Sequence, residues 1–344
     1  MGRVSSTKEI KHPTGIVTSR FFARHKNQQK VSEDQSTAFP FNCNGKWVHH
    51  SDLAHPFDIK YLKSLNSTDY FQLIDKLTND DPSEWAIPLP PHVIRELEGN
   101  PLTPKNFIPI YSRIRQIRAR IVAPVDKMGC HMVPILISQR YGITKDRINP
   151  RDYRLQLLIS LVLATLTKNE VVTKVMLALM EYCVTQLGYT SGITLDAMLE
   201  IAPKDLEQLI VPTRFYRQKA LRITQMVRAI RERFNSDVPT NIEGMTSLPG
   251  VGPKIGFLAL QKSWGRIDGI CVDLHVHRLC RQFNFVDPQK CVIAEQTRQA
   301  LELWLPRDLW YEINIVLVGF GQMVCTSTIK KCDLCPVNDI CNVW

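Results

Sequence analysis

The sequence predicts an all-α fold built as two helical lobes. Apolar residues recur at intervals of three and four from about residue 110 onward, which is the period of an amphipathic helix. The alternating pattern of β-strands is almost absent. The helical part covers about 235 residues, and this length favours two lobes over one bundle.

The composition is that of a soluble globular protein, with 344 residues and 44% hydrophobic side chains. The best membrane candidate, LLISLVLATL at 157–166, is too short to span a bilayer, and no signal peptide opens the chain. We therefore expect no membrane partner, and a reducing compartment in which clustered cysteines indicate metal ligands before disulfides. The net charge of +10 favours nucleic-acid phosphates as partners, although many basic proteins bind no nucleic acid specifically.

Residues 1–107 are predicted to form an N-terminal extension that is largely flexible. The first thirty or so are rich in lysine, arginine and serine, as in a basic tail, a transit peptide or a nuclear-import segment. Residues 41–80 have enough apolar positions for one or two short helices, the second capped by Ser67 or Thr68. Six prolines then indicate a linker, because proline neither donates a backbone hydrogen bond nor continues a helix.

Helices are predicted in order through the rest of the chain. Isoleucines at helical spacing in 110–121 leave four arginines mostly on the opposite side, as either a solvated face or a phosphate-binding one. Asn149 and Pro150 provide an N-cap followed by proline at the first helical position. The segment after them, DYRLQLLISLVLATL, is apolar nearly all round, which predicts a central buried helix. Two amphipathic helices then end at Gly188 and Asn235.

The stretch LPGVGPK at 248–254 predicts a tight hairpin between two helices. Gly250 and Gly252 let the backbone turn sharply and expose N–H groups at the start of the next helix, where they suit a phosphate. The spacing matches a helix-hairpin-helix element that binds DNA backbone, and it also fits a helix connection that binds nothing. Lys254 falls in the first turn of the next helix, where the helix dipole disfavours an ammonium. It is either a charged phosphate contact or, when neutral, a nucleophile toward a sugar C1′.

A second polar cluster follows in the stretch ICVDLHVHR. Asp273 precedes a predicted helix, so it is either an N-cap or a carboxylate that faces the lysine and stabilises a developing positive charge. His275 and His277 are two residues apart and would point in different directions on a helix. A zinc pair is therefore not expected from them.

Four cysteines lie within seventeen residues near the end of the printed sequence, spaced C-x6-C-x2-C-x5-C: Cys325, Cys332, Cys335 and Cys341. Structural zinc usually uses two close cysteine pairs, and only one close pair is present. The spacing favours an iron–sulfur cluster wrapped by one segment, with zinc as the alternative. Lys330 and Lys331 lie in the first loop, where ligation would present two positive charges to a phosphate.

These motifs occur together in one known family. The hairpin at 248–254, VDLHVHR at 272–278, LVGFGQMVC at 317–325 and the cysteine spacing resemble the endonuclease III family of DNA glycosylases, most closely its animal members, the endonuclease III-like protein 1 type. The resemblance extends over about 108–344, and APVDKMG at 123–129 is similar to the family's N-terminal piece.

The resemblance implies a six-helix domain at 150–264, with the helix-hairpin-helix at about 240–262. A [4Fe-4S] lobe would combine 108–149 with 265–344, and double-stranded DNA would lie in the cleft between the lobes. The four cysteines would be the cluster ligands. We expect a monomer that acts in the nucleus, with the mitochondrion as a second compartment, beside downstream base excision repair proteins.

The resemblance also implies a bifunctional DNA N-glycosylase and AP lyase of base excision repair. Its substrates would be oxidised pyrimidines such as thymine glycol and 5-hydroxycytosine, or abasic sites, with the damaged nucleotide flipped out of the duplex. Lys254 would displace the base, form a Schiff base with the sugar and cut the strand by β-elimination. Asp273 matches the family's carboxylate. A monofunctional glycosylase is the less favoured enzyme, because such relatives lack the lysine.

The chain departs from the family pattern at three positions. Leu166 stands where the family has a glutamine that fills the gap left by the flipped base, Asn169 replaces an acid, and Leu274 replaces a threonine. Phe215 occupies a second wedge position, where an aromatic ring can stack. We expect weaker discrimination of the opposite base, or slower flipping. These changes keep open a second hypothesis, a non-catalytic or weakly active lesion-binding iron–sulfur protein.

Overall fold

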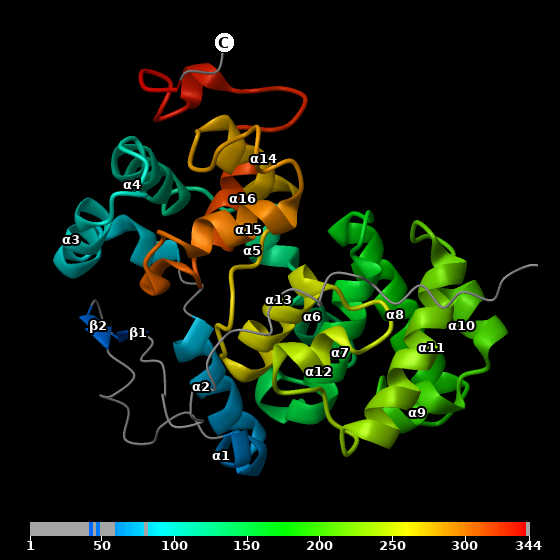
Figure 1. Ribbon diagram of the computed structural model, residues 1–344. Helices are drawn as coiled ribbons and strands as arrows, with labels where there is room; N and C mark the ends of the chain where they lie inside the picture. Colours follow the sequence, from blue (N-terminus) through cyan, green and yellow to red (C-terminus); the bar gives the residue numbers. More distant parts are fainter. Residues whose placement is uncertain (1–40, 44–45, 49–58, 79–81, 342–344) are drawn as a thin grey trace, which may run out of the picture. The chain divides into compact units, whose positions relative to one another are not determined.

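The protein is described by a computed structural model over residues 41–43, 46–48, 59–78 and 82–341 (Figure 1). The basic segment expected at the start of the chain lies outside these ranges. The α-helices, in chain order, are α1 Ile59–Ser64, α2 Ser67–Thr78, α3 Pro91–Gly99, α4 Phe107–Arg118, α5 Pro124–Met128, α6 Val133–Arg140, α7 Pro150–Leu163, α8 Asn169–Thr185, α9 Leu195–Glu200, α10 Pro203–Leu209, α11 Tyr216–Arg233, α12 Ile242–Thr246, α13 Pro253–Trp264, α14 Leu274–Gln282, α15 Ala294–Glu302 and α16 Ile313–Met323.

Short 3-10 helices and two strands complete the described elements: η3 Pro82–Ala86, η4 Lys145–Arg147, η5 Arg307–Leu309, η6 Cys332–Leu334, and the antiparallel pair β1 Phe41–Cys43 and β2 Lys46–Val48. The all-α prediction is confirmed, since these two three-residue strands are the only ones in the described ranges. No helix within those ranges is both long and apolar enough to cross a membrane.

The first hydrophobic core surrounds α7, which packs against α6, α8 and α13 (Figure 1). The central residues of α7 are apolar on every side, and Leu157, Leu158 and Ile159 are completely buried. The helix begins as its sequence predicts, because the Asn149 side chain accepts a hydrogen bond from the Arg151 N–H at 2.9 Å. The prediction of a capped, central buried helix is confirmed.

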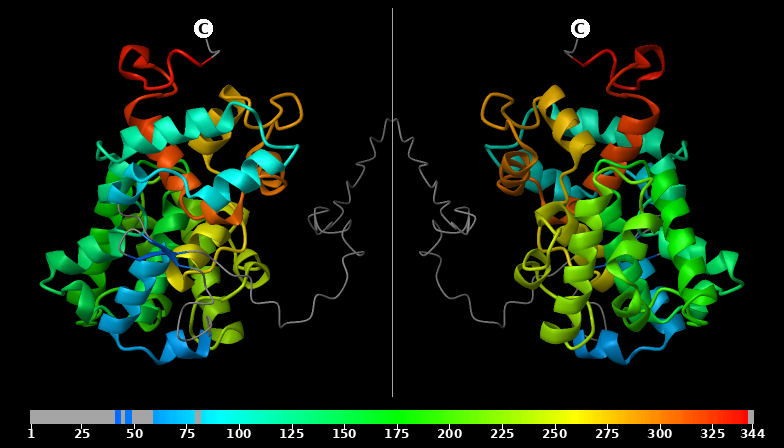
Figure 2. Two further views of the ribbon diagram at one scale, coloured as in Figure 1. Left: turned by 90° about the vertical axis from the view of Figure 1, so that its left-hand side faces the viewer. Right: turned by 90° about the vertical axis from the view of Figure 1, so that its right-hand side faces the viewer.

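A second core forms where α4 packs against α16 beside α14 and α15. Both views in Figure 2 show the cyan N-terminal helices beside the orange and red C-terminal ones. Phe107 is stacked on Tyr111 with ring centres 5.0 Å apart, and it meets Phe285 and Trp304 edge-on at 4.9 and 4.8 Å. Aromatic contacts of this kind join sequence segments almost two hundred residues apart.

The described part of the predicted extension differs from a flexible segment, because its helices belong to both cores. On α2, Phe71 is buried in the first core, and the Tyr70 hydroxyl donates to the Ser263 carbonyl at 2.7 Å. Trp85 and Val93 are buried in the second core. These large apolar side chains can be removed from water only by packing on the distant lobes.

The proline-rich stretch is likewise not an open linker. Pro91 is the first residue of α3, a position at which the missing N–H has no partner to lose.

The predicted cap of α2 was Ser67 or Thr68, whereas the structure uses Asn66, whose side chain accepts from the Asp69 N–H at 2.9 Å. Ser67 is instead the first residue of α2.

The described chain passes between the cores at three places, and the first crossing lies between Ile74, in the first core, and Trp85, in the second. Val133, Ile135 and Ile137 of α6 are buried in the first core, although residues 108–149 were expected in the cluster lobe. α6 therefore belongs with the six-helix part, because its apolar face packs on α7 and α8. The third crossing lies between Trp264, in the first core, and Ile267, in the second.

Of the four arginines predicted for one face of this segment, Arg115 and Arg118 are buried, whereas Arg113 is half-buried and Arg120 is exposed. Arg115 is buried and pairs with Glu312 at 2.9 Å. Arg118 is completely buried, and its guanidinium donates to Asp126 at 2.7 Å. A Cβ atom at Gly319 would fall 2.3 Å from that guanidinium, so the glycine leaves room for it. Buried charges of this kind persist because each one is paired.

Candidate active site

A cleft of about 750 Å³ lies between residues of the two cores. α13 and the turn after α7 contribute from the first core, and the start of α14 and the inner side of α16 contribute from the second. Three residues predicted for the site line it together: Leu166, Lys254 and Asp273. The cleft thus joins residues that are more than one hundred positions apart in the sequence.

Lys254 follows directly from the helix-hairpin-helix, which the structure forms from α12, the turn 247–252 and α13. Gly250 has a φ of 85°, a conformation that glycine adopts without strain. Gly252 precedes the first residue of α13, and Lys254 is the second residue of that helix. The lysine side chain is exposed in the cleft, where a substrate can reach it.

Asp273 is the N-cap of α14, as one of its two interpretations predicts. One carboxylate oxygen accepts a hydrogen bond from the Val276 N–H at 2.8 Å, which fixes the side chain at the mouth of the helix. The same residue lines the cleft with Lys254. Its second oxygen takes no part in the capping bond, so the capping role and a charge facing the cleft are compatible.

Two thiols lie beside the lysine. Burial raises the pKa of Cys271 to about 12, with Lys254 opposing this rise and Asp273 adding to it. Burial likewise raises the pKa of Cys130 to about 11, and Lys254 again opposes the rise. The Cys271 thiol donates to the Lys254 carbonyl at 3.6 Å. Both thiols are therefore neutral at physiological pH, and Lys254 and Asp273 both act on the pKa of Cys271.

The two histidines point in different ways, as predicted. His275 lines the cleft, and burial lowers its pKa, with the negative charge of Asp273 opposing this effect. A Cβ atom at Gly321 would fall 2.7 Å from His275 Nδ1, so this glycine of α16 makes space for the imidazole ring. His277 instead forms a 2.7 Å hydrogen bond with the Thr297 hydroxyl on α15.

The two predicted wedge residues are both apolar and exposed. Leu166 is 56% exposed in the turn that follows α7, and Phe215 is 52% exposed immediately before α11. Both have left-handed backbones, with φ of 52° and 59°. Residues other than glycine rarely adopt this backbone conformation, so the surrounding structure must hold the two turns in place.

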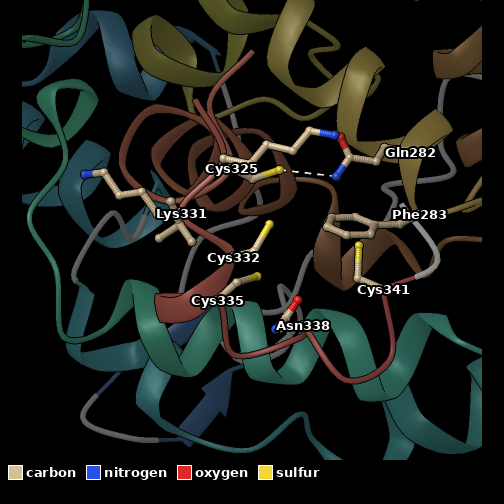
Figure 3. A pocket seen from close by; sticks show the side chains of 10 residues that line it. Gln282, Phe283, Cys325, Lys331, Cys332, Cys335, Asn338 and Cys341 are labelled. Carbon is tan, nitrogen blue, oxygen red and sulfur yellow. Dashed lines mark hydrogen bonds between the residues drawn. The ribbon is translucent and has the colours of Figure 1, made fainter. Parts of the chain in front are cut away.

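The four C-terminal cysteines line one cavity, shown in Figure 3. Cys325 follows α16, Cys332 begins η6, Cys335 directly follows η6, and Cys341 follows the last described turn. The Gln282 side chain donates to the Cys325 sulfur at 3.2 Å. None of the cysteines with described side chains forms a disulfide.

The donor set and its surroundings fit an iron–sulfur cluster in type. Four thiols with a neighbouring N–H donor are what such a cluster requires, because hydrogen bonds to ligand sulfurs stabilise the thiolate charge. Among the described residues, no three histidine, cysteine or acidic side chains converge on a point where a single metal ion would sit. The four sulfurs lie around one cavity, and the preference for a cluster over a zinc ion comes from the spacing of the cysteines in the sequence.

Lys330 and Lys331 lie in the same loop, and both are exposed. The loop is shaped by a short bridge between Cys325 and Lys330 and by a 3.0 Å bond from the Lys331 N–H to the Val324 carbonyl. Thr326 and Ser327, at the start of this loop, line the cleft. The cysteine loop therefore reaches the edge of the candidate site.

Sequence reasoning missed several polar residues of the cleft: Cys130, His131, Lys262, Asn314 and Gln322. The Asn314 side chain donates to the Cys271 carbonyl at 2.9 Å, and the side-chain oxygen of Gln322 accepts from the Val125 N–H at 3.0 Å. These two side chains therefore hold the backbone at Cys271 and Val125 beside the cleft. The one available signal was a polar residue inside an otherwise apolar helix, as Asn314 is in α16.

The fold and the cleft together define a helix-hairpin-helix protein with a lysine and a carboxylate at the mouths of two helices. Residues 159–307 match the HhH-GPD superfamily of base excision DNA repair proteins. Endonuclease III homolog 2 of Saccharomyces cerevisiae is 47% identical over 285 residues, which cover 83% of this chain and 75% of the yeast protein. The chain belongs to the endonuclease III family.

Endonuclease III-like protein 1 of Gallus gallus is 37% identical over 246 residues, covering 72% of this chain and 80% of the relative. Of these two relatives the yeast protein shares more residues, although the motifs suggested the animal type. A solved structure, described as a non-covalent Endonuclease III-DNA complex, is 23% identical and has a TM-score of 0.49, covering 60% of this chain and 91% of the other. The family assignment rests on the sequence matches.

Proposed function

We propose that this protein is a bifunctional DNA N-glycosylase and AP lyase that removes oxidised pyrimidines, such as thymine glycol and 5-hydroxycytosine, from double-stranded DNA. The observation that supports this most directly is that Lys254 and Asp273 line the same cleft. Each residue is fixed by the start of a helix, the lysine by α13 and the carboxylate by α14. Membership of the endonuclease III family supports the same reaction class.

Lys254 is the proposed nucleophile. Its nitrogen attacks C1′ of the damaged nucleotide, the bond from C1′ to the base breaks, and the base leaves with a proton. Ring opening then gives a Schiff base between Lys254 and C1′. Loss of a C2′ proton expels the 3′ phosphate, so β-elimination cuts the strand. The exposure of the lysine in the cleft suits attack on an extruded nucleotide.

Asp273 is the proposed electrostatic partner. Its carboxylate stabilises the positive charge that develops on the sugar as the base departs. The 2.8 Å capping bond holds the carboxylate before substrate arrives, so little reorganisation is needed in the transition state. Leu274 is 69% exposed beside it and offers no hydroxyl to orient it.

DNA is the proposed partner of the rim of the cleft. The backbone N–H groups of the hairpin at Gly250 and Gly252 are suited to phosphate oxygens, and Lys330 and Lys331 add positive charge. Leu166 and Phe215 are proposed to enter the duplex where the damaged nucleotide leaves it. A single chain supplies all of these groups, which is consistent with a monomer.

Cys325, Cys332, Cys335 and Cys341 are the proposed ligands of a [4Fe-4S] cluster. Arg113 of α4 pairs with Asp339 at 2.5 Å and donates to the Pro336 carbonyl at 3.2 Å, which attaches the cysteine segment to the second core. The cluster would hold the loop that carries Lys330 and Lys331 in one shape. Its role is therefore structural in this proposal.

The cellular site of action is proposed from the same function. A repair glycosylase acts where DNA is, in the nucleus and, as a second compartment, the mitochondrion. It would hand its cut strand to downstream base excision repair proteins. Imaging of a fluorescent fusion tests this, and exclusion from both compartments would overturn it.

Borohydride trapping on a duplex with one thymine glycol tests the proposed reaction. Wild type should form a covalent complex, because borohydride reduces a Schiff base to a stable amine, and Lys254→Ala should form none. Lys168→Ala is the matched control, since it removes another exposed lysine of the same cleft. Protein that carries its cluster and binds the lesion, yet never traps even at abasic sites, would instead be the lesion-binding protein.

A further inference from the structure

Lys219 on α11 is a buried cation with an unusual set of partners. It is 4% exposed, and its ammonium donates to the Leu163 carbonyl at 2.7 Å, the Thr165 carbonyl at 2.8 Å and the Thr167 hydroxyl at 3.0 Å. All three N–H donors are thus used on the turn that carries Leu166. Burial lowers the pKa of Lys219 to about 8.

These partners lie where α7 ends and its last carbonyls have no helical N–H to bind. A cation at this end of a helix is favoured by the helix dipole. Leu166 is held in its left-handed conformation between Thr165 and Thr167, the two residues whose oxygens the ammonium binds. The Lys219 ammonium therefore binds the residue on each side of the exposed Leu166.

The Thr167 hydroxyl connects this turn to the second one. It accepts from Lys219 and also from the Arg214 N–H at 3.2 Å, the residue just before Phe215. Phe215 is the N-cap of α11, and its carbonyl accepts the first backbone bond of that helix, from the N–H of residue 219 at 3.0 Å. The Lys219 ammonium thus holds the first turn, and the Thr167 hydroxyl that it binds links this turn to the second; each turn has a left-handed residue at its tip.

We propose that Lys219 is a positioning residue that locks Leu166 and Phe215 into one preformed wedge, with the Thr167 hydroxyl as the joint between their turns. The inference rests on the proposed function, in that the wedge enters a DNA duplex. A wedge that opens a base stack must keep its shape against the stacking force, so apolar tips on loose turns would extrude the nucleotide slowly. Lys219 acts through the two tips and does not touch the reacting atoms.

The test compares duplex and single-stranded substrates in Thr167→Val, Thr167→Ser and Lys219→Met. Single-turnover cleavage of thymine glycol in a duplex should fall roughly tenfold in Thr167→Val and roughly a hundredfold in Lys219→Met. Cleavage of an abasic site in single-stranded DNA should stay within about twofold of wild type, because no base stack has to be opened there. Thr167→Ser keeps the hydroxyl and should retain the wild-type duplex rate.

A 2-aminopurine placed beside the lesion reports extrusion by its fluorescence, without any chemistry. Wild type should raise this signal on binding, and Thr167→Val should raise it more slowly. An equal loss of cleavage rate on both substrates, or an unchanged duplex rate in Thr167→Val, would overturn the inference. Thr167 is half-buried, so Thr167→Val provides the test even where Lys219→Met fails to fold. If the wild-type protein extrudes the base but does not cut the strand, the proposed lyase activity is contradicted and the inference about the wedge still stands.

Discussion

Leu166 shows how one side chain can alter what a shared scaffold does. Its 56% exposure and its place on the rim of the cleft suit entry into a duplex, but leucine offers no hydrogen bond to the base left behind. The family resemblance implies a glutamine at this position, whose amide could bind that base. We expect a leucine to fill the same gap by contact alone and so to discriminate the opposite base less.

Leu166→Gln is therefore expected to make the enzyme sensitive to the opposite base. The ratio of single-turnover rates for thymine glycol opposite adenine and opposite guanine should be near one in wild type. In the variant it should shift by roughly twofold to tenfold, the value of one net hydrogen bond. Leu166→Met keeps an apolar tip and serves as the control. A ratio that is equal in all three proteins would show that this side chain does not sense the opposite base.

At the scale of elements, α7 illustrates how a buried helix accommodates charge at its start. Arg154 lies in the core and pairs with Asp237 through bonds of 2.8 and 3.0 Å, with its guanidinium 4.2 Å from the centre of the Trp264 ring. Asp152 in the first turn is less well placed. Burial raises the pKa of Asp152 to about 6, with nearby Arg154 opposing this and Asp237 adding to it.

Asp152→Asn is expected to stabilise the protein near neutral pH. The folded-state pKa lies above the value of an unfolded aspartate, so ionisation of Asp152 costs the native state stability as pH rises through about 6. The variant avoids that cost, and we expect a gain on the order of 2 kcal/mol at pH 7 to 8. The gain should shrink as pH falls from 6 toward 4.

Urea unfolding between pH 5 and pH 8 measures this difference. Glu170→Gln is a suitable control, because it removes an exposed carboxylate from the first turn of α8. A gain of the same size at every pH would contradict burial as the origin of the shift in the pKa of Asp152.

At the scale of the whole molecule, the described N-terminal helices are part of the two cores. α2 contributes Phe71 to the first core, and Trp85 in η3 joins the second. The candidate active-site cleft lies between residues of those same cores. The described helices before residue 107 therefore support the site from the two cores, and none of their described residues is in its lining.

A chain that begins at residue 107 is expected to be far less stable than one that begins at residue 59. It would lose several buried aromatic residues, each worth about 3 to 5 kcal/mol, against a total stability of about 5 to 15 kcal/mol for an ordinary domain. Thermal unfolding and soluble yield of the two chains provide the comparison. Equal unfolding temperatures would show that the helices before residue 107 add nothing to the cores.

Local features were the predictable part of this fold. The buried α7 with its Asn149 cap, the hairpin that places Lys254 in the first turn of α13, and Asp273 as the cap of α14 all follow from residues within one helical turn. Helical periodicity, capping and glycine conformations act over such short distances. The cysteine spacing likewise indicated one centre, because four thiols within one segment can reach a common cavity.

Long-range features needed the tertiary structure. Arg115 reads as a surface residue in the sequence, and its burial depends on Glu312, 197 positions away. The proline-rich stretch resembles a linker until Val93 and Leu97 are seen in the second core. A polar residue is buried only where a distant partner satisfies it, and no local pattern encodes that partner.

The sequence by itself thus determined the helical class, the family and the chemical groups that the site offers. The tertiary structure alone decided that Lys254, Asp273 and Leu166 share one cleft, and that Lys219 supports the turns of both exposed wedge residues. The physical reason is that a reactive group is specified by its own residue and its near neighbours. Its working environment is specified by the packing of helices far apart in the chain.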